Sequence, residues 1–105
     1  MAREVSINDL EQAITQGAYV MDVREAWEFE SGHVPRAHHI ALNTIPDRLS
    51  DIPRLEQIWV ICQSGGRSMT AANYLEAQGF DVVSVAGGTG SWIGAGKETS
   101  FEVSL

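Results

Sequence analysis

The chain has a single cysteine, Cys62, among its 105 residues. One cysteine cannot form a disulfide within its own chain, which fits a reducing compartment. Cys62 also has no second cysteine with which to share a zinc ion, and His33, His38 and His39 do not follow a zinc-ligand spacing. We therefore expect neither a metal nor a cofactor.

Positive charge and long apolar runs are also scarce. Lys97 is the only lysine, the arginines are scattered, and the formal net charge is −7. Because contacts to phosphates need clustered Lys and Arg, this composition argues against nucleic acid as a partner. No apolar run approaches the ~20 residues that span a bilayer, and residues 1–6 lack the apolar segment of a secretory signal. We expect a cytoplasmic protein with no membrane partner.

Short apolar runs alternate with helical patterns along the chain. The runs that predict strands are 18–23, 37–42, 58–62 and 81–86. The patterns that predict helices are 7–16, 25–31, 67–78 and 91–95, with a further short helix capped by Asn43 that places Ile45, Leu49 and Ile52 on one side. We expect a loop over 87–90 and an extended tail over 97–105. The alternation favours βαβ units and a parallel sheet.

The most informative segment surrounds the cysteine. A β-branched run ends at Cys62, and Gly65 and Gly66 separate it from a helix that begins near Arg67. N–H groups at a helix N-terminus and the helix dipole favour negative charge, and such sites lower thiol pKa values to roughly 3.5–7.5. Arg67 adds a positive charge at the rim. We therefore expect a reactive thiolate, against the alternative of an inert buried cysteine.

Three predicted strands end at conspicuous residues. Asp22 and Cys62 lie at the carboxyl ends of two of the strands, and Gly87 follows a third. Sites in parallel α/β sheets form beyond the carboxyl ends of the strands. We expect these three positions to meet at one edge of the sheet.

Three blocks together resemble the rhodanese family, and in particular its small single-domain members. The blocks are Asp22-Val23-Arg24-Glu25 with Glu28-Phe29 and Gly32-His33-Val34-Pro35, then Cys62-Gln63-Ser64-Gly65-Gly66-Arg67-Ser68, and last Val85-Ala86-Gly87-Gly88 with Trp92. The resemblance covers nearly the whole chain. It implies an α/β fold, a single rhodanese-like domain over residues 1–105 whose mainly parallel five-stranded sheet carries helices on both faces.

The resemblance also implies a sulfurtransferase. Cys62 would be the catalytic nucleophile, taking a sulfane sulfur from a small donor and passing it to a thiol, to cyanide or to an acceptor protein. The resemblance implies a sulfur-binding loop of Gln63, Ser64, Gly65, Gly66 and Arg67, supported by Asp22, Arg24 and Ser68. Independently of the family, a thiolate is needed to attack a donor sulfur, and a persulfide anion gains from a ring of donors as an oxyanion does.

Arg36 departs from the family pattern, which usually has Gly after the proline. We expect a local backbone difference there, away from the nucleophile, and Arg36 could add positive charge near the pocket mouth. Trp92 could line that pocket, whereas His33 is expected to bind backbone carbonyls rather than act as a base. Because Arg67 is the loop's only cation, strong selectivity for doubly charged thiosulfate is doubtful, and small persulfides remain open as donors.

Other functions are compatible with parts of the pattern. Phosphatases and arsenate reductases place five residues between Cys and Arg, whereas this chain has four, Gln63 to Gly66. A tighter loop suits one sulfur better than a tetrahedral phosphate. The glycine-rich stretch after Gly87 fits neither the dinucleotide nor the P-loop pattern. The main alternative is a persulfide carrier or a regulatory rhodanese-like module that serves a partner protein.

Overall fold

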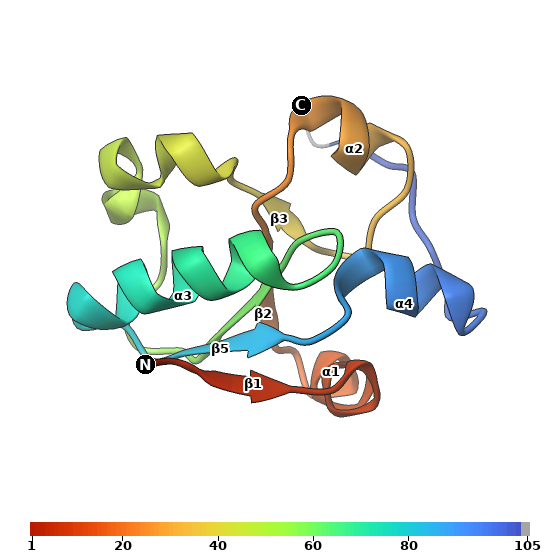
Figure 1. The fold of residues 1–105 in the computed structure, drawn as a ribbon, viewed down its shortest axis with the longest axis horizontal. Helices are drawn as coiled ribbons and strands as arrows, with labels where there is room; N and C mark the ends of the chain where they lie inside the picture. The colour runs from red at the N-terminus through yellow and green to blue at the C-terminus, as the bar shows by residue number, and fades with distance from the viewer. Residues whose placement is uncertain (104–105) are drawn as a thin grey trace.

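Five short parallel strands form the centre of the structure, a computed structural model that describes residues 1–103 (Figure 1). The strands are β1 (Arg3–Val5), β2 (Tyr19–Asp22), β3 (His38–His39), β4 (Ile58–Ile61) and β5 (Val82–Val85), in the order β1-β5-β4-β2-β3. Every pairing is parallel, so the predicted sheet is confirmed. None of the four predicted runs corresponds to β1, because β1 has three residues of which only Val5 is buried.

The helices follow the predicted order, with two corrections. They are α1 (Ile7–Thr15), α2 (Ala26–Glu30), α3 (Gly66–Ala77) and α4 (Gly88–Gly94), together with the 3₁₀ helices η1 (Leu42–Asp47) and η2 (Leu49–Asp51). The segment predicted to start at an Asn43 cap instead starts after Ala41 as two 3₁₀ turns, and Pro46 lies inside the first. No helix within residues 1–103 combines the length and the apolar character needed to cross a membrane.

The second correction concerns α4, which begins at Gly88 rather than near Ser91. Within the predicted loop over 87–90, Gly87 is the N-cap of α4 and residues 88–90 are its first turn. Two N–H groups of this turn have partners on another segment. Thr89 N–H donates to the Cys62 carbonyl at 2.8 Å, and Gly90 N–H donates to the Gln63 carbonyl at 3.0 Å. The start of α4 is therefore attached to the end of β4.

Helices cover both faces of the sheet, each over its own core. Alternate strand residues point to opposite faces: Ile58 and Val60 of β4 pack with Leu75 of α3, whereas Ile61 packs with Leu10 of α1 on the other side. Each fully buried aliphatic side chain contributes about 1.5–3 kcal/mol relative to exposure. Cys62 continues the alternation and belongs to the α3 side.

Two features lie near β3, the backbone conformation of Arg36 and the path of the C-terminal tail. Arg36 has a φ of 68°, in the left-handed region where a glycine is unstrained. Arg36 thus adopts a backbone conformation that suits the glycine usual in the family, and the expected backbone difference stays a prediction. The predicted tail bends back there, because Ser100 and His33 exchange backbone hydrogen bonds of 2.8 and 2.9 Å. The last two positions of the predicted tail, 104–105, lie outside the described residues.

Gly88 is the position where α4 requires glycine. It has a φ of +58°, and a Cβ placed on it would lie 2.4 Å from the Cys62 carbonyl oxygen and 2.7 Å from the Gln63 carbonyl carbon. Both obstacles are backbone atoms, so no side-chain rotation relieves the overlap. A larger residue would push α4 away from the end of β4.

We predict that Gly88→Ala lowers the free energy of unfolding by about 3 kcal/mol, because it adds backbone overlap to left-handed strain. The matched control is Gly94→Ala in the same helix, where a Cβ meets nothing within 4 Å. That change should have no cost, or a gain of up to ~1 kcal/mol from helix propensity. Urea unfolding of both variants tests this, and equal stabilities would contradict the proposed steric role of Gly88.

Candidate active site

The end of β4 brings the predicted site residues together. In the sheet register Asp22 of β2 lies beside Ile61 of β4, so Cys62 follows directly at the carboxyl edge. Gly87 lies beyond β5 at the same edge, and a Cβ on Gly65 would be 3.6 Å from the Gly87 nitrogen. The three strand ends thus meet, as the sequence predicts. The Cys62 residue is 1% exposed.

The loop after Cys62 turns its backbone toward the sulfur. Gly65 has a φ of 117°, and its N–H donates to Cys62 Sγ at 3.1 Å. Gln63, Ser64 and Gly66 are exposed, whereas Gly65 is half-buried. A residue with a Cβ is strained at this φ. The left-handed turn at Gly65 therefore lets the amide point inward while the loop remains at the surface.

The thiol pKa reflects a competition between burial and hydrogen bonding. Burial is the largest single influence and raises the pKa of Cys62, because it disfavours the charged thiolate. The Ser68 hydroxyl and the backbone N–H groups of Ser68, Gly65 and Ser64 act in the opposite direction. Together the hydrogen bonds outweigh burial, and the pKa of the Cys62 thiol is lowered. The buried position and the reactive thiolate are therefore compatible.

Ser68 connects the sulfur to the sheet. Its Oγ lies 3.5 Å from Cys62 Sγ and 2.8 Å from the Oγ of Ser84, a fully buried residue of β5. Ser68 Oγ also donates to the Gly65 carbonyl at 3.1 Å when the thiol is protonated. When the sulfur is ionised, Ser84 can donate to Ser68 and Ser68 can donate to the thiolate, since each hydroxyl is both donor and acceptor.

Asp22 and Arg24 form a buried ion pair behind the loop. Arg24 Nε lies 3.0 and 3.1 Å from the two Asp22 carboxylate oxygens, and its Nη2 lies 2.9 Å from Oδ2. The remaining nitrogen, Nη1, donates to Gln63 Oε1 at 3.0 Å. Asp22 is 0% and Arg24 3% exposed. The pair thus contacts the loop through Gln63, which matches the supporting position expected for both residues.

Arg67 lies at the rim of the loop, with its charge matched by a carboxylate. Its Nη1 and Nη2 donate to Glu28 Oε1 and Oε2 at 2.7 and 2.9 Å, an arrangement with two parallel hydrogen bonds. Arg67 is 38% exposed and Glu28 11%. Hydrogen bonding from Arg67 is the main cause that lowers the pKa of Glu28 to about 2. The expected positive charge is present, but a permanent negative charge accompanies it.

Two further residues, His33 and Trp92, make no hydrogen bond to the cysteine loop in the described part of the chain. His33 stacks on Phe29, and its Nδ1 lies 2.6 Å from the Phe29 carbonyl, which agrees with the expected structural contact. Trp92 is 2% exposed and packs in the core on the α1 side, with its Nε1–H donating to the Glu98 carbonyl. Trp92 therefore packs inside the molecule rather than forming a pocket wall.

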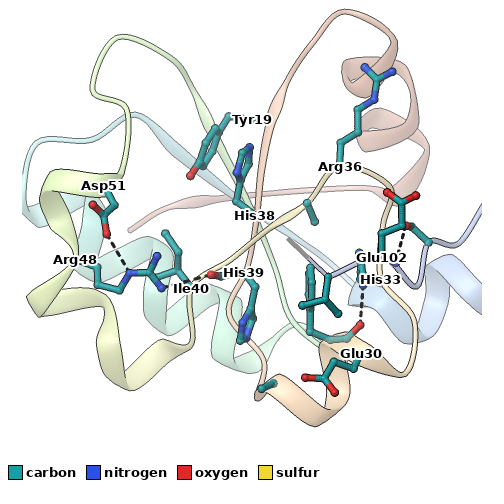
Figure 2. A pocket seen from close by; sticks show the side chains of 15 residues that line it. Tyr19, Glu30, His33, Arg36, His38, His39, Ile40, Arg48, Asp51 and Glu102 are labelled. Carbon is teal, nitrogen blue, oxygen red and sulfur yellow. Dashed lines mark hydrogen bonds and ion pairs between the residues drawn. The ribbon is translucent and has the colours of Figure 1, made fainter. Parts of the chain in front are cut away.

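A groove of about 570 Å³ runs along β3 (Figure 2). Its lining includes Tyr19 stacked on His38, the Arg48–Asp51 ion pair and Arg36. Neither Cys62 nor any residue of its loop lines this groove. The candidate site is instead a surface loop over a buried sulfur.

Two residues of the site have no role in the sequence prediction. Glu28 stands in the first family-like block, but no partner in the sequence identifies it as the residue bound to Arg67. Ser84 lies within a predicted strand, and the signal that could have found it is a serine among valines at an inward position. Both contacts join segments far apart in the chain, 39 residues for Arg67–Glu28 and 16 for Ser68–Ser84.

Together, the parallel α/β fold and the cysteine loop at the carboxyl end of its central strand define a class of protein. The chain matches the family model "Rhodanese-like domain" over residues 6–95. It is 41% identical over 78 residues to the thiosulfate sulfurtransferase GlpE of Pseudomonas savastanoi pv. phaseolicola, covering 73% of this chain and 74% of that protein. The chain belongs to the rhodanese-like family.

Two further comparisons extend over nearly the full chain. A sulfurtransferase of Allochromatium vinosum is 33% identical over 95 residues, covering 88% of this chain and 89% of that protein. The crystal structure of a rhodanese-related protein from Thermoplasma volcanium superposes with a TM-score of 0.90 at 31% identity, covering 95% of this chain and 99% of that one. These similarities support a role in sulfur transfer.

We predict that iodoacetamide alkylates Cys62 with a pH midpoint below the ordinary thiol value of ~8.5. Hydrogen bonds to the sulfur stabilise the thiolate, so Ser68→Ala should move the midpoint upward. Thr70→Ala is the matched control, because it removes an exposed hydroxyl of the same helix that donates to the Gly66 carbonyl instead. Rate profiles read by intact mass test this. A wild-type midpoint at the ordinary value would show that the loop does not stabilise the thiolate.

The Glu28–Arg67 pair should give stability a dependence on acid. The folded pKa of Glu28 is about 2, whereas an unfolded Glu titrates near ~4.3. The contribution is therefore complete above the unfolded pKa and is lost as the pH falls toward 2. At pH 6 the free energy of unfolding of the wild type should exceed that of Glu28→Gln by about 1 kcal/mol, as for a partly exposed ion pair. Urea unfolding should show this difference shrinking between pH 5 and 3, and a constant difference would contradict the linkage.

Proposed function

We propose that Cys62 is the nucleophile of a sulfurtransferase that carries a sulfane sulfur as a persulfide. The observation that carries this proposal is the Gly65 N–H aimed at a buried sulfur at 3.1 Å. The donor would be thiosulfate or a small persulfide, and the acceptor a thiol or cyanide. The GlpE relative is itself named as a thiosulfate sulfurtransferase.

The proposed loading step balances without a further reactant. The Cys62 thiolate attacks the outer sulfur of the donor, a new S–S bond forms at Sγ, and the donor's own bond to that sulfur breaks. From thiosulfate the leaving group is sulfite, and from an organic persulfide it is a thiolate. The transferred sulfur remains in the sulfane state, so no external oxidant or reductant takes part. Attack by the acceptor then regenerates the Cys62 thiolate.

The loop suits the charged intermediate of this reaction. N–H donors fixed in advance stabilise charge with little reorganisation, as in an oxyanion hole. We infer that the amides of residues 63–67 surround the outer sulfur, with Asp22 and Arg24 holding Gln63, and Ser68 holding Cys62. Because Cys62 is 1% exposed, a donor has to present a slender sulfur end to reach Sγ.

The cation geometry supports this reading over phosphate-ester chemistry. A phosphatase needs its arginine free to bind the oxygens of a phosphoryl group, whereas both Arg67 terminal nitrogens are held by Glu28. A single sulfur atom needs no such fork. A carrier that gives its sulfur only to a partner protein uses the same loaded Cys62, and turnover with small acceptors separates the two roles.

We predict that incubation with thiosulfate or an organic persulfide adds one sulfur, about 32 Da, to the intact protein, as one covalently bound sulfur requires. Cys62→Ser should lose the adduct, since the weaker hydroxyl nucleophile cannot attack the donor sulfur, and should retain the wild-type fold. Intact mass spectrometry and circular dichroism provide the two readouts. A folded wild type that gains no sulfur from any donor would rule out the proposal.

Release of the bound sulfur identifies the acceptor class. Loaded protein mixed with cyanide or a small thiol should return to its starting mass, with thiocyanate or a new persulfide formed. Retention of the sulfur with both acceptors, despite complete loading, would favour the carrier role instead. A Cys62→Ser variant that still transferred sulfur at the wild-type rate would exclude Cys62 as the nucleophile.

A further inference from the structure

Both arginines that contact the candidate site already have a carboxylate partner. Arg24 is held by Asp22 within the buried pair, and Arg67 is held by Glu28 through two hydrogen bonds. Other basic side chains have contacts elsewhere: Lys97 pairs with Glu11, Arg48 pairs with Asp51, and Arg54 lies over the Phe80 ring. In the two pairs at the site, each arginine charge is balanced by a carboxylate charge. Neither arginine therefore balances the negative charge of the Cys62 thiolate.

Glu28 is itself fixed in position. Its Oε1 accepts the Glu25 N–H at 3.0 Å as well as Arg67 Nη1 at 2.7 Å, and its side chain is 11% exposed. With a pKa of about 2, Glu28 is ionised wherever the enzyme would work. Its charge is therefore a constant part of the site, held on α2 beside the loop.

From these contacts we propose that Glu28 sets the choice of sulfur donor, by disfavouring donors with two negative charges relative to those with one or none. This inference rests on the proposed function. Thiosulfate brings two negative charges to a negatively charged sulfur, and like charges brought close together are costly in a partly desolvated site. A free Arg67 would offset that repulsion, but Glu28 occupies its hydrogen-bonding fork. Organic persulfides and thiosulfonates are the donors that this arrangement favours.

A matched pair of donors isolates the charge. Thiosulfate and methanethiosulfonate present the same outer sulfur, but a methyl group replaces one charged oxygen in the second. Attack by Cys62 on methanethiosulfonate forms the same persulfide and releases methanesulfinate, so the step balances as it does with thiosulfate. The ratio of the two second-order loading rates, read by intact mass, therefore reports discrimination by donor charge.

Glu28→Gln should raise the thiosulfate to methanethiosulfonate ratio by about tenfold or more, because it frees one positive charge beside the loop. Glutamine is also accepted at this helix position, where its amide oxygen can keep the Glu25 contact. The control Glu30→Gln removes an equal charge from an exposed side chain on the same helix, and should leave the ratio within about twofold, since exposed distant charges are screened. Adding Arg67→Gln to Glu28→Gln should abolish the gain.

Ionic strength provides a test that needs no variant. Added salt screens repulsion, so wild-type loading by thiosulfate should accelerate more than loading by methanethiosulfonate. An unchanged ratio in folded Glu28→Gln, or a thiosulfate rate that falls with salt in wild type, would overturn the role of Glu28 while leaving Cys62 loading intact. Failure of both donors to load folded wild type would instead remove the proposed function, and this inference with it.

Discussion

The central constraint on this structure is that the sulfur of Cys62 is buried and still accepts hydrogen bonds. A cysteine at the end of an apolar strand is normally protonated and inert, because burial disfavours its charged form. Here the chain reverses direction within three residues, so that the Gly65 N–H returns to Cys62 Sγ. The helix that follows adds the Ser68 hydroxyl at the same sulfur. These hydrogen bonds thus outweigh the burial that would otherwise raise the pKa of the Cys62 thiol.

Contacts with α4 stabilise the shape of the loop that follows Cys62. The first turn of α4 donates two N–H groups to the carbonyls of Cys62 and Gln63, so α4 holds both carbonyls in place. Farther along the loop, the Gly65 N–H donates to the sulfur. Gly88 permits this approach because any Cβ would overlap the Cys62 carbonyl. The third family-like block therefore stabilises the second, although it contributes no atom bonded to the sulfur.

Much of the fold could be predicted from local pattern, because the apolar runs of β2, β4 and β5 and the glycines that end the helices are local signals. Apart from β1, which is too short and too exposed to give a pattern, the errors fall where tertiary contacts override local preference. Asn43 has the side chain of a helix cap, yet the turn begins at Leu42. The glycine-rich stretch 87–90 is predicted as a loop, yet residues 88–90 are the first turn of α4, with hydrogen bonds to the Cys62 and Gln63 carbonyls just beyond β4. Ser84 lies within the predicted strand 81–86, but nothing in that run identifies its hydroxyl partner, Ser68 of α3.

The charged residues of the site likewise divide into those that a local motif predicts and those that it does not. Cys62, its loop and the Asp22–Arg24 pair could be predicted because they lie within compact motifs. The partner of Arg67 could not, because Glu28 lies on a different helix, and pairing across the fold leaves no local pattern.

The pairing of both arginines with carboxylates affects how strongly the site attracts anions. Full positive charges act over long range and attract every anion, including products that must leave. Peptide N–H groups act over short range and only along their bond direction. By pairing both arginines with carboxylates and leaving the sulfur to the amides, the chain stabilises a negative atom already in place without drawing negative molecules toward it. Under the proposed function, the choice of donor in this chain of net charge −7 would depend on what reaches the sulfur rather than on what the surface attracts.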